Sequence, residues 1–476
     1  MRGLDVRGLD LRGLDLREHA PSVLVATLSA AFGVALLQLT GVLSVVISAD
    51  ELAGSSSTVQ FVLGIITLVF IAIAVYVGAV VTANTFATII AGRIRTIALL
   101  RLIGSSAVAQ RRAVAGEGLR VGVVGALLGA VVGSLVTVLV VRIGVATSFI
   151  PDLPFDYVPP VIALPIVAVA LTTWLASWIG SRRVLRVSPI QATGAAQEET
   201  LAESSGHRVR NVLALALTVG GGALLAVAVV LGLLTPAAVL VGVVGGLLSF
   251  SGFVLGAQLV MPRGLRLVGR AFGSSAPARL AAQNAVRYPE RSTRTTIGLV
   301  IGVTLITMFA VAVESFQTII RAAQRAQPEV YQGVDQILLV TVVVFSILMG
   351  FSALIAAVGM VNNLSLSVLQ RTRELGLLRA LGFTAGQVRR MILVESASLT
   401  AAAVLVGLVL GTFYGWVGAQ SMLGAISGAP GLVAPTVPVA LLAIVVVAAV
   451  VLTLVASVAP SRRATRVAPV AALAQD

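Results

Sequence analysis

Residues 84–104 read NTFATIIAGRIRTIALLRLIG, and residues 362–382 read NNLSLSVLQRTRELGLLRALG. The two stretches repeat at a constant offset of 278 residues. The matching positions in the first copy are Arg93, Arg95, Leu99, Leu100, Arg101 and Gly104. Those in the second copy are Arg371, Arg373, Leu377, Leu378, Arg379 and Gly382. Self-similarity at a fixed spacing indicates a structural unit that occurs twice in the chain.

The similarity continues on the C-terminal side of both stretches. Arg111, Arg112 and Glu117 match Arg389, Arg390 and Glu395, after which each copy enters an apolar, glycine-dotted segment. The copies close with SRRVLRVSPIQA at 181–192 and SRRATRVAPVAA at 461–472. Glu117 and Glu395 begin their apolar segments, so we expect them to pair with nearby arginines at the membrane interface rather than relay protons.

The composition excludes a water-soluble fold. Hydrophobic residues make up 58% of the 476 residues, charged residues only 11%, and the mean hydropathy is +1.04. The apolar blocks predict ten membrane-spanning helices, because backbone polar groups in hydrocarbon need internal partners. The blocks are 22–47, 60–91, 118–141, 160–179, 212–233, 236–261, 296–316, 337–365, 392–418 and 437–458. The division at Thr235 and Pro236 is the weakest, and eight or nine spans are the alternative.

The basic residues orient the chain. All 33 are arginines, and 30 of them fall in the segments that lie on one side if the N-terminus is cytoplasmic. Such a bias follows the positive-inside rule. It predicts that both termini are cytoplasmic, and it removes the reason to expect binding to nucleic acid. The all-arginine, Ala/Val-rich composition suggests a GC-rich bacterial genome, and hence a bacterial cell membrane.

These features together predict an all-α polytopic membrane protein of about ten transmembrane helices, with two parallel four-helix repeats and a two-helix linker. The expected parts are a cytoplasmic leader at 1–20, a first module at 21–192, a linker with two spans at 193–262 and a second module at 263–472. Glycines at four-residue spacing, Gly125, Gly129 and Gly133 in one repeat and Gly407 and Gly411 in the other, predict close helix packing.

The sequence gives no basis for covalent chemistry in this chain. Cysteine is absent, and the only histidines, His19 and His207, lie in polar segments without a cluster of potential metal ligands. Lysine is also absent, so no GxxxxGK[ST] phosphate loop occurs. We therefore expect no catalytic residue, metal or cofactor here, and any ATP with its Mg²⁺ to be bound by another chain.

The repeated pattern resembles the FtsX-like (MacB-like) permease module of ABC transporters. The likeness rests on an Asn at the end of a long span, a basic segment ending in Leu-Leu-Arg-x-[Ile/Leu]-Gly, a downstream Glu and an Arg-Arg tail, each present twice. It implies that Arg93–Gly104 and Arg371–Gly382 dock on a separate homodimeric ATPase, one permease to two ATPase subunits. The first copy has Thr96 where the second has the expected acid, Glu374, so the two contacts need not be equal.

Three functions are compatible with the repeat, and the first two of them also with the resemblance. The first is ATP-driven extrusion of an amphiphilic substrate such as a peptide antibiotic, a drug, a lipid or a lipid-linked molecule. The second is mechanotransmission, in which ATP hydrolysis drives an outer-face partner such as a wall hydrolase without transport. The third is ATP-independent secondary transport, for which intramembrane ionisable residues are few. The likeness also allows an extracytoplasmic lipoprotein or peptidase as a partner, with membrane lipids around the chain.

The competing interpretation of the repeat is an ordinary pair of juxtamembrane basic loops, which explains its charge but not its leucines.

Overall fold

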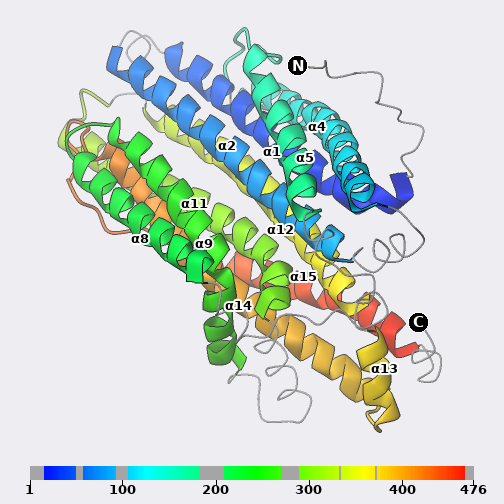
Figure 1. Cartoon of the computed structure of the whole chain (residues 1–476). Coiled ribbons are helices and arrows are strands. Elements are labelled where there is room, and N and C mark those ends of the chain that lie inside the picture. The colour runs from blue at the N-terminus through cyan, green and yellow to red at the C-terminus, as the bar shows by residue number, and fades with distance from the viewer. Residues whose placement is uncertain are drawn as a thin grey trace. The chain divides into compact units, whose positions relative to one another are not determined.

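The computed structural model describes eight stretches of the chain: 16–49, 57–92, 106–148, 150–181, 208–269, 289–331, 334–369 and 372–466. Every regular element in these stretches is a helix (Figure 1). They are α1 (Leu16–Ser48), α2 (Ser57–Gly92), α4 (Ala107–Ala146), η3 (Pro160–Ile162), α5 (Ala163–Gly180), α8 (Arg208–Leu231), α9 (Ala238–Gly269), α11 (Pro289–Ala326), α12 (Val334–Leu369), α13 (Thr372–Ala380), α14 (Ala385–Leu423) and α15 (Val439–Arg466). The predicted all-α fold is confirmed.

The long helices correspond to the predicted apolar blocks. Within the described residues, nine helices are long and apolar enough to cross a membrane, and α15 contributes a shorter apolar part at Leu442–Leu454. The division at Thr235 and Pro236 is real, because α8 ends at Leu231 and α9 begins at Ala238. The amide of Thr235 donates to the carbonyl of Leu231 at 3.0 Å and closes the last turn of α8.

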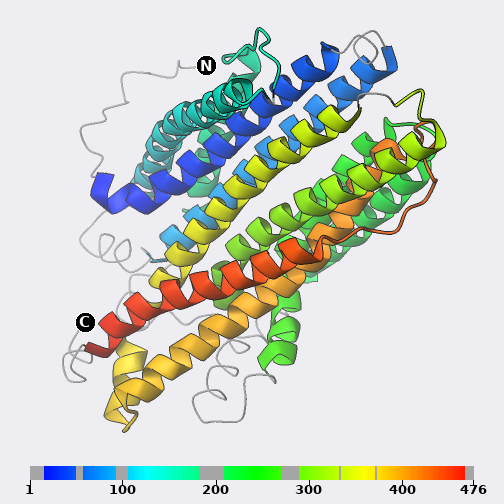
Figure 2. The same cartoon turned by 180° about the vertical axis from the view of Figure 1, so that it is seen from behind.

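Two compact units make up the chain. One comprises residues 1–42 and 70–196, and the other comprises residues 43–69 and 197–476. In the first unit α4 packs against α5 and against α1. In the second unit α11 packs against α9, α12 and α14, and the α8–α9 pair packs against α14. Figure 2 shows α15, in red, running beside α12 and α14, which it contacts.

Glycines bring α4 and α1 together in the first unit. A Cβ atom added at Gly129 would lie 2.6 Å from the Cβ of Ala30. One added at Gly133 would lie 2.7 Å from the backbone oxygen of Ala31. Real Cβ atoms do not approach so closely, so the absence of a side chain is what permits this spacing of the two backbones.

The second unit repeats this packing at the matching positions. A Cβ atom at Gly407 would lie 2.7 Å from the Cβ of Val303 on α11, and one at Gly411 would lie 2.6 Å from the Cβ of Thr307. Gly407 and Gly411 match Gly129 and Gly133 at the offset of 278 residues. The repeat seen in the sequence therefore extends to the way in which its helices pack.

The contact between the third and fourth helices of each repeat also recurs, with different chemistry. In the second unit Thr453 of α15 donates from its hydroxyl to that of Thr400 on α14 at 2.8 Å, and both side chains are buried. The equivalent contact in the first unit joins Gly122 and Thr173, where an added Cβ would lie 2.8 Å from the Cβ of Thr173. A hydroxyl pair in one copy thus replaces a glycine contact in the other.

Candidate functional site

The predicted coupling residues are described only in part. Arg93, Arg95, Leu99, Leu100, Arg101 and Gly104 lie outside the described residues, as does Arg371. Arg373 and Glu374 lie in α13, although their side chains are not described. Leu377, Leu378, Arg379 and Gly382 can be placed in full. Together with the start of α14 they form a bend over residues 372–395, which we call the elbow.

The first half of the elbow ends in a glycine-dependent cap. Gly382 has a φ of +99°, in the left-handed region that glycine adopts without strain. Its amide donates to the carbonyl of Arg379 at 3.1 Å, and the amide of Phe383 donates to the carbonyl of Leu378 at 3.0 Å. These two bonds form a Schellman motif, which satisfies the free carbonyls at the end of α13 and reverses the chain.

The second half of the elbow begins with an equally complete cap. The hydroxyl of Thr384 accepts from the amide of Gln387 at 3.2 Å, and the side-chain oxygen of Gln387 accepts from the amide of Thr384 at 2.9 Å. This reciprocal pair is a capping box, which satisfies amides that would otherwise lack partners at the start of α14. Because only a few residues separate the two caps, the direction of α13 relative to α14 is closely constrained.

An apolar cluster fills the inside of the elbow. Its buried members are Leu375, Val388, Met391 and Ile392, none of them more than 3% exposed. Leu378 and Phe383 pack against this cluster from the end of α13 and from the turn. Both residues stand at the two positions whose apolar side chains often accompany a Schellman motif. Leu378 therefore contributes to the fold of the elbow itself.

The outside of the elbow carries two exposed leucines. Leu377 is 51% exposed and Leu381 is 72% exposed. They are four residues apart at the end of α13, so they lie near one another on one side of it. Arg389 and Arg390 are exposed on the first turns of α14. The elbow thus carries exposed apolar side chains on α13 and exposed arginines on α14. Leu381 was not among the residues that the sequence singled out, although its first-copy match, Ile103, lies in the same repeated segment.

The described part of the first copy shows a related start to its third helix. Ser106 caps α4 by accepting from the amide of Ala109 at 3.1 Å, and Ser106 matches Thr384 at the repeat offset. Arg111 stacks its guanidinium over the ring of Trp178 on α5, with 4.2 Å from the guanidinium carbon to the ring centroid. This cation–π contact ties α4 to α5. Arg389, the match of Arg111, is exposed instead.

The two matched glutamates differ in burial. Glu395 is only 8% exposed on α14, whereas Glu117 on α4 is half-buried. Both engage in polar interactions, so neither is a free carboxylate. Among the residues that the structure describes, no group of three or more histidine, aspartate or glutamate side chains is arranged to hold a metal ion.

A comparison against known families matches a region in each half of the chain. The FtsX-like permease C-terminal family matches residues 68–189 and 346–469, together more than half of the chain. The chain belongs to the FtsX-like permease family. Each matched region contains one copy of the repeated sequence, at 84–104 or 362–382, and the two long helices that follow it.

Two relatives of this permease come from Bacillus subtilis (strain 168). The uncharacterized ABC transporter permease YknZ is 32% identical over 105 residues, which cover 22% of this chain and 25% of that protein. The ABC transporter permease YtrF is 26% identical over 132 residues, which cover 26% of this chain and 30% of that protein. Each match thus spans less than a third of the relative's length.

Proposed function

We propose that this permease is the membrane-spanning part of an ATP-driven ABC exporter, and that the elbow is a docking surface for a separate ATPase subunit. The observation that supports the proposal is the pair of exposed leucines on a doubly capped, internally packed bend. Exposed leucines on a short helix suit insertion into an apolar groove of a protein partner. The names of both relatives, which are ABC transporter permeases, support the same class.

The elbow is suited to transmit movement because it joins two long helices. α12 has 36 residues and leads towards α13, and α14 has 39 residues and leads away from it. At ~1.5 Å per residue, α12 measures ~54 Å, well beyond the ~30 Å of a hydrocarbon core. A partner that moved the elbow would therefore move α14, which is joined to α13 through the caps and the apolar cluster.

The proposed complex contains one copy of this chain and two ATPase subunits that carry ATP and Mg²⁺. The first coupling segment, Arg93–Gly104, would dock the second ATPase subunit. The proposed cargo is an amphiphilic molecule, since the membrane-spanning helices carry few charged side chains that could line an aqueous path. Mechanotransmission to an outer partner uses the same elbow and differs only in what its movement drives.

Docking can be tested by placing charges on the exposed leucines. The double variant L377D/L381D should co-purify with less ATPase than the wild-type chain does, because it removes docking at one of the two proposed segments. Each buried, unpaired aspartate would cost about 1–3 kcal/mol of binding free energy. The variant should still insert into the membrane and melt near the wild-type temperature, because both positions are exposed in the elbow.

Two further variants separate docking from folding. L432D changes a leucine that is 64% exposed in the loop before α15, and it should leave co-purification intact. L378D places a charge against the inner cluster and should lower the melting temperature of the isolated chain. Wild-type levels of ATPase bound to L377D/L381D would remove the elbow as the docking surface.

A further inference from the structure

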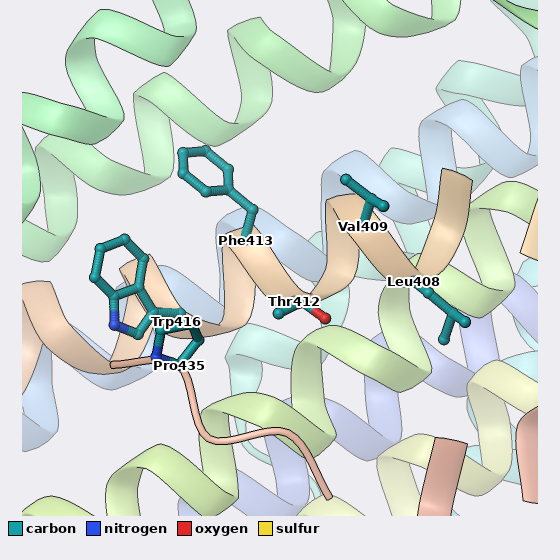
Figure 3. Close-up of a pocket in the computed structure, with 6 residues that line it drawn as sticks. All are labelled: Leu408, Val409, Thr412, Phe413, Trp416 and Pro435. Atoms are coloured by element: carbon teal, nitrogen blue, oxygen red, sulfur yellow. The ribbon is translucent and has the colours of Figure 1, made fainter. Parts of the chain in front are cut away.

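An apolar pocket of about 430 Å³ lies along the half of α14 that is far from the elbow. Figure 3 shows its lining on successive turns of α14, together with a proline from the loop that leads to α15. The lining residues are Leu408, Val409, Thr412, Phe413, Trp416 and Pro435. The volume falls within the range of small-molecule sites, and five of the six side chains are apolar.

The pocket opens on a surface that suits contact with hydrocarbon. Val409 is 69% exposed, Phe413 is 40% exposed, and Leu405 one turn before Val409 is 55% exposed. All three lie on a helix that is long and apolar enough to span a membrane. Bulky apolar side chains on a spanning helix face either lipid or another helix. The mouth of the pocket is therefore continuous with the membrane-facing surface of α14.

Hydrogen bonds connect the part of the pocket at Trp416 to the loop before α15 and engage the polar groups there. The indole nitrogen of Trp416 donates to the carbonyl of Val433 at 2.6 Å. The side chain of Gln420 accepts from the amide of Val433 at 3.1 Å and donates to the carbonyl of Gly431 at 2.9 Å. Because the indole N–H is engaged, the pocket offers a polar ligand little besides the hydroxyl of Thr412. It is shaped for an apolar chain.

The two aromatic side chains that line the pocket, Phe413 and Trp416, occur in only one of the two repeats. Phe413 and Trp416 match Leu135 and Val138 of α4 at the offset of 278 residues. The packing of this helix on its neighbour is otherwise the same in both repeats, through Gly129 and Gly133 in one and Gly407 and Gly411 in the other. The shared architecture therefore does not require aromatic residues here, and the rings serve something specific to the second repeat.

We infer that the pocket binds one acyl chain of a membrane phospholipid, from the leaflet on the side of α14 opposite the elbow. In the orientation predicted from the arginines this is the outer leaflet. Trp416 lies near the C-terminal end of α14 and is hydrogen-bonded to the loop that carries Pro435, and tryptophan is enriched at membrane interfaces. Transfer of an acyl chain from lipid to protein brings no hydrophobic gain, so binding depends on dispersion contacts with the two rings.

Quenching of Trp416 fluorescence tests the inference directly. The chain has three tryptophans, so W174F/W178F leaves Trp416 as the only one. This variant would be reconstituted in vesicles of phosphatidylcholine brominated at the middle of one acyl chain, with the unbrominated lipid as reference. We expect strong quenching of Trp416. Adding V409F, which places a ring at the mouth of the pocket, should reduce the quenching at least twofold.

The matched control is V447F on α15. Val447 is 62% exposed, comparable with Val409, but it does not line the pocket. It should leave the quenching of Trp416 unchanged.

Native mass spectrometry of the chain in mild detergent supplies a second readout, in which wild type and V447F should retain one phospholipid that V409F loses. Equal quenching in W174F/W178F and in its V409F and V447F derivatives would overturn the inference. So would absence of quenching in W174F/W178F, or equal numbers of lipids retained by wild type, V409F and V447F. None of these outcomes depends on an ATPase.

Discussion

At the scale of single residues, Gly382 determines how α13 ends. Its φ of +99° is costly for residues that carry a Cβ, and no atom lies within 4 Å of where a Cβ would be. Any effect of substitution therefore comes from backbone conformation and not from a clash. G382A should lower the free energy of unfolding by about 1–2 kcal/mol, measured by thermal melting of the chain in detergent.

The neighbouring glycine provides the control for that prediction. Gly386 lies in the first turn of α14 and has space for a Cβ, with 3.9 Å to the nearest atom. G386A should therefore be neutral or slightly stabilising, since alanine favours helix more than glycine does. Asparagine tolerates the left-handed region better than alanine, so G382N should recover part of the loss. Equal melting of G382A and wild type would contradict the assigned cap.

Single residues also show what the sequence could not predict. The repeat identified Leu377 and Leu378 as equivalent members of a leucine pair. In the structure Leu378 packs against the cluster inside the elbow, while Leu377 is 51% exposed. In a helix of nine residues, two leucines at adjacent positions do not reveal which of them is exposed. That choice depends on the angle between α13 and α14, which the two caps determine.

At the scale of helices, the packing of α14 on α11 depends on a row of glycines. A Cβ added at Gly411 would lie 2.6 Å from the backbone oxygen of Thr304, which cannot move independently of α11. G411A should therefore destabilise the chain by about 1–3 kcal/mol through overpacking, measured as a lower melting temperature. G418A, on the same helix with nothing within 4 Å, should melt at or above the wild-type temperature.

The long helices and several of their contacts could be predicted from the sequence. Apolar block lengths predicted the long helices, and glycine spacing predicted the close contacts of Gly129, Gly133, Gly407 and Gly411. The pocket beside Trp416 could not be predicted, because it requires Pro435 and Val433 to return to α14 from a loop without periodic pattern. The hydroxyl pair of Thr400 and Thr453 likewise needed the relative register of two helices.

At the scale of the whole molecule, the distribution of arginines predicts the orientation. Tags placed before Met1 and after Asp476 should both be protected from reagents added to intact cells. A tag inserted at Gln332, between α11 and α12, should be accessible from outside. The reason is the preference for arginine-rich segments to remain in the cytoplasm. Termini found on opposite faces would show an odd number of spans and would exclude a parallel arrangement of the two repeats.

The duplication also predicts the composition of the proposed complex. One chain carries two copies of the predicted coupling segment, and the FtsX-like permease family matches one region around each of them. If each segment docks one ATPase subunit, a single chain of 48.7 kDa supplies both contacts for an ATPase dimer. We therefore expect the mass of the intact complex, measured in detergent or nanodiscs, to correspond to one permease and two ATPase subunits.

L377D/L381D alters only the second segment and should leave a complex with weakened binding at one site, from which one ATPase subunit dissociates more readily. A complex of two permeases with two ATPase subunits would mean that each chain uses only one of its coupling segments. In that case the variant would either abolish ATPase binding altogether or leave it unchanged, depending on which segment is used.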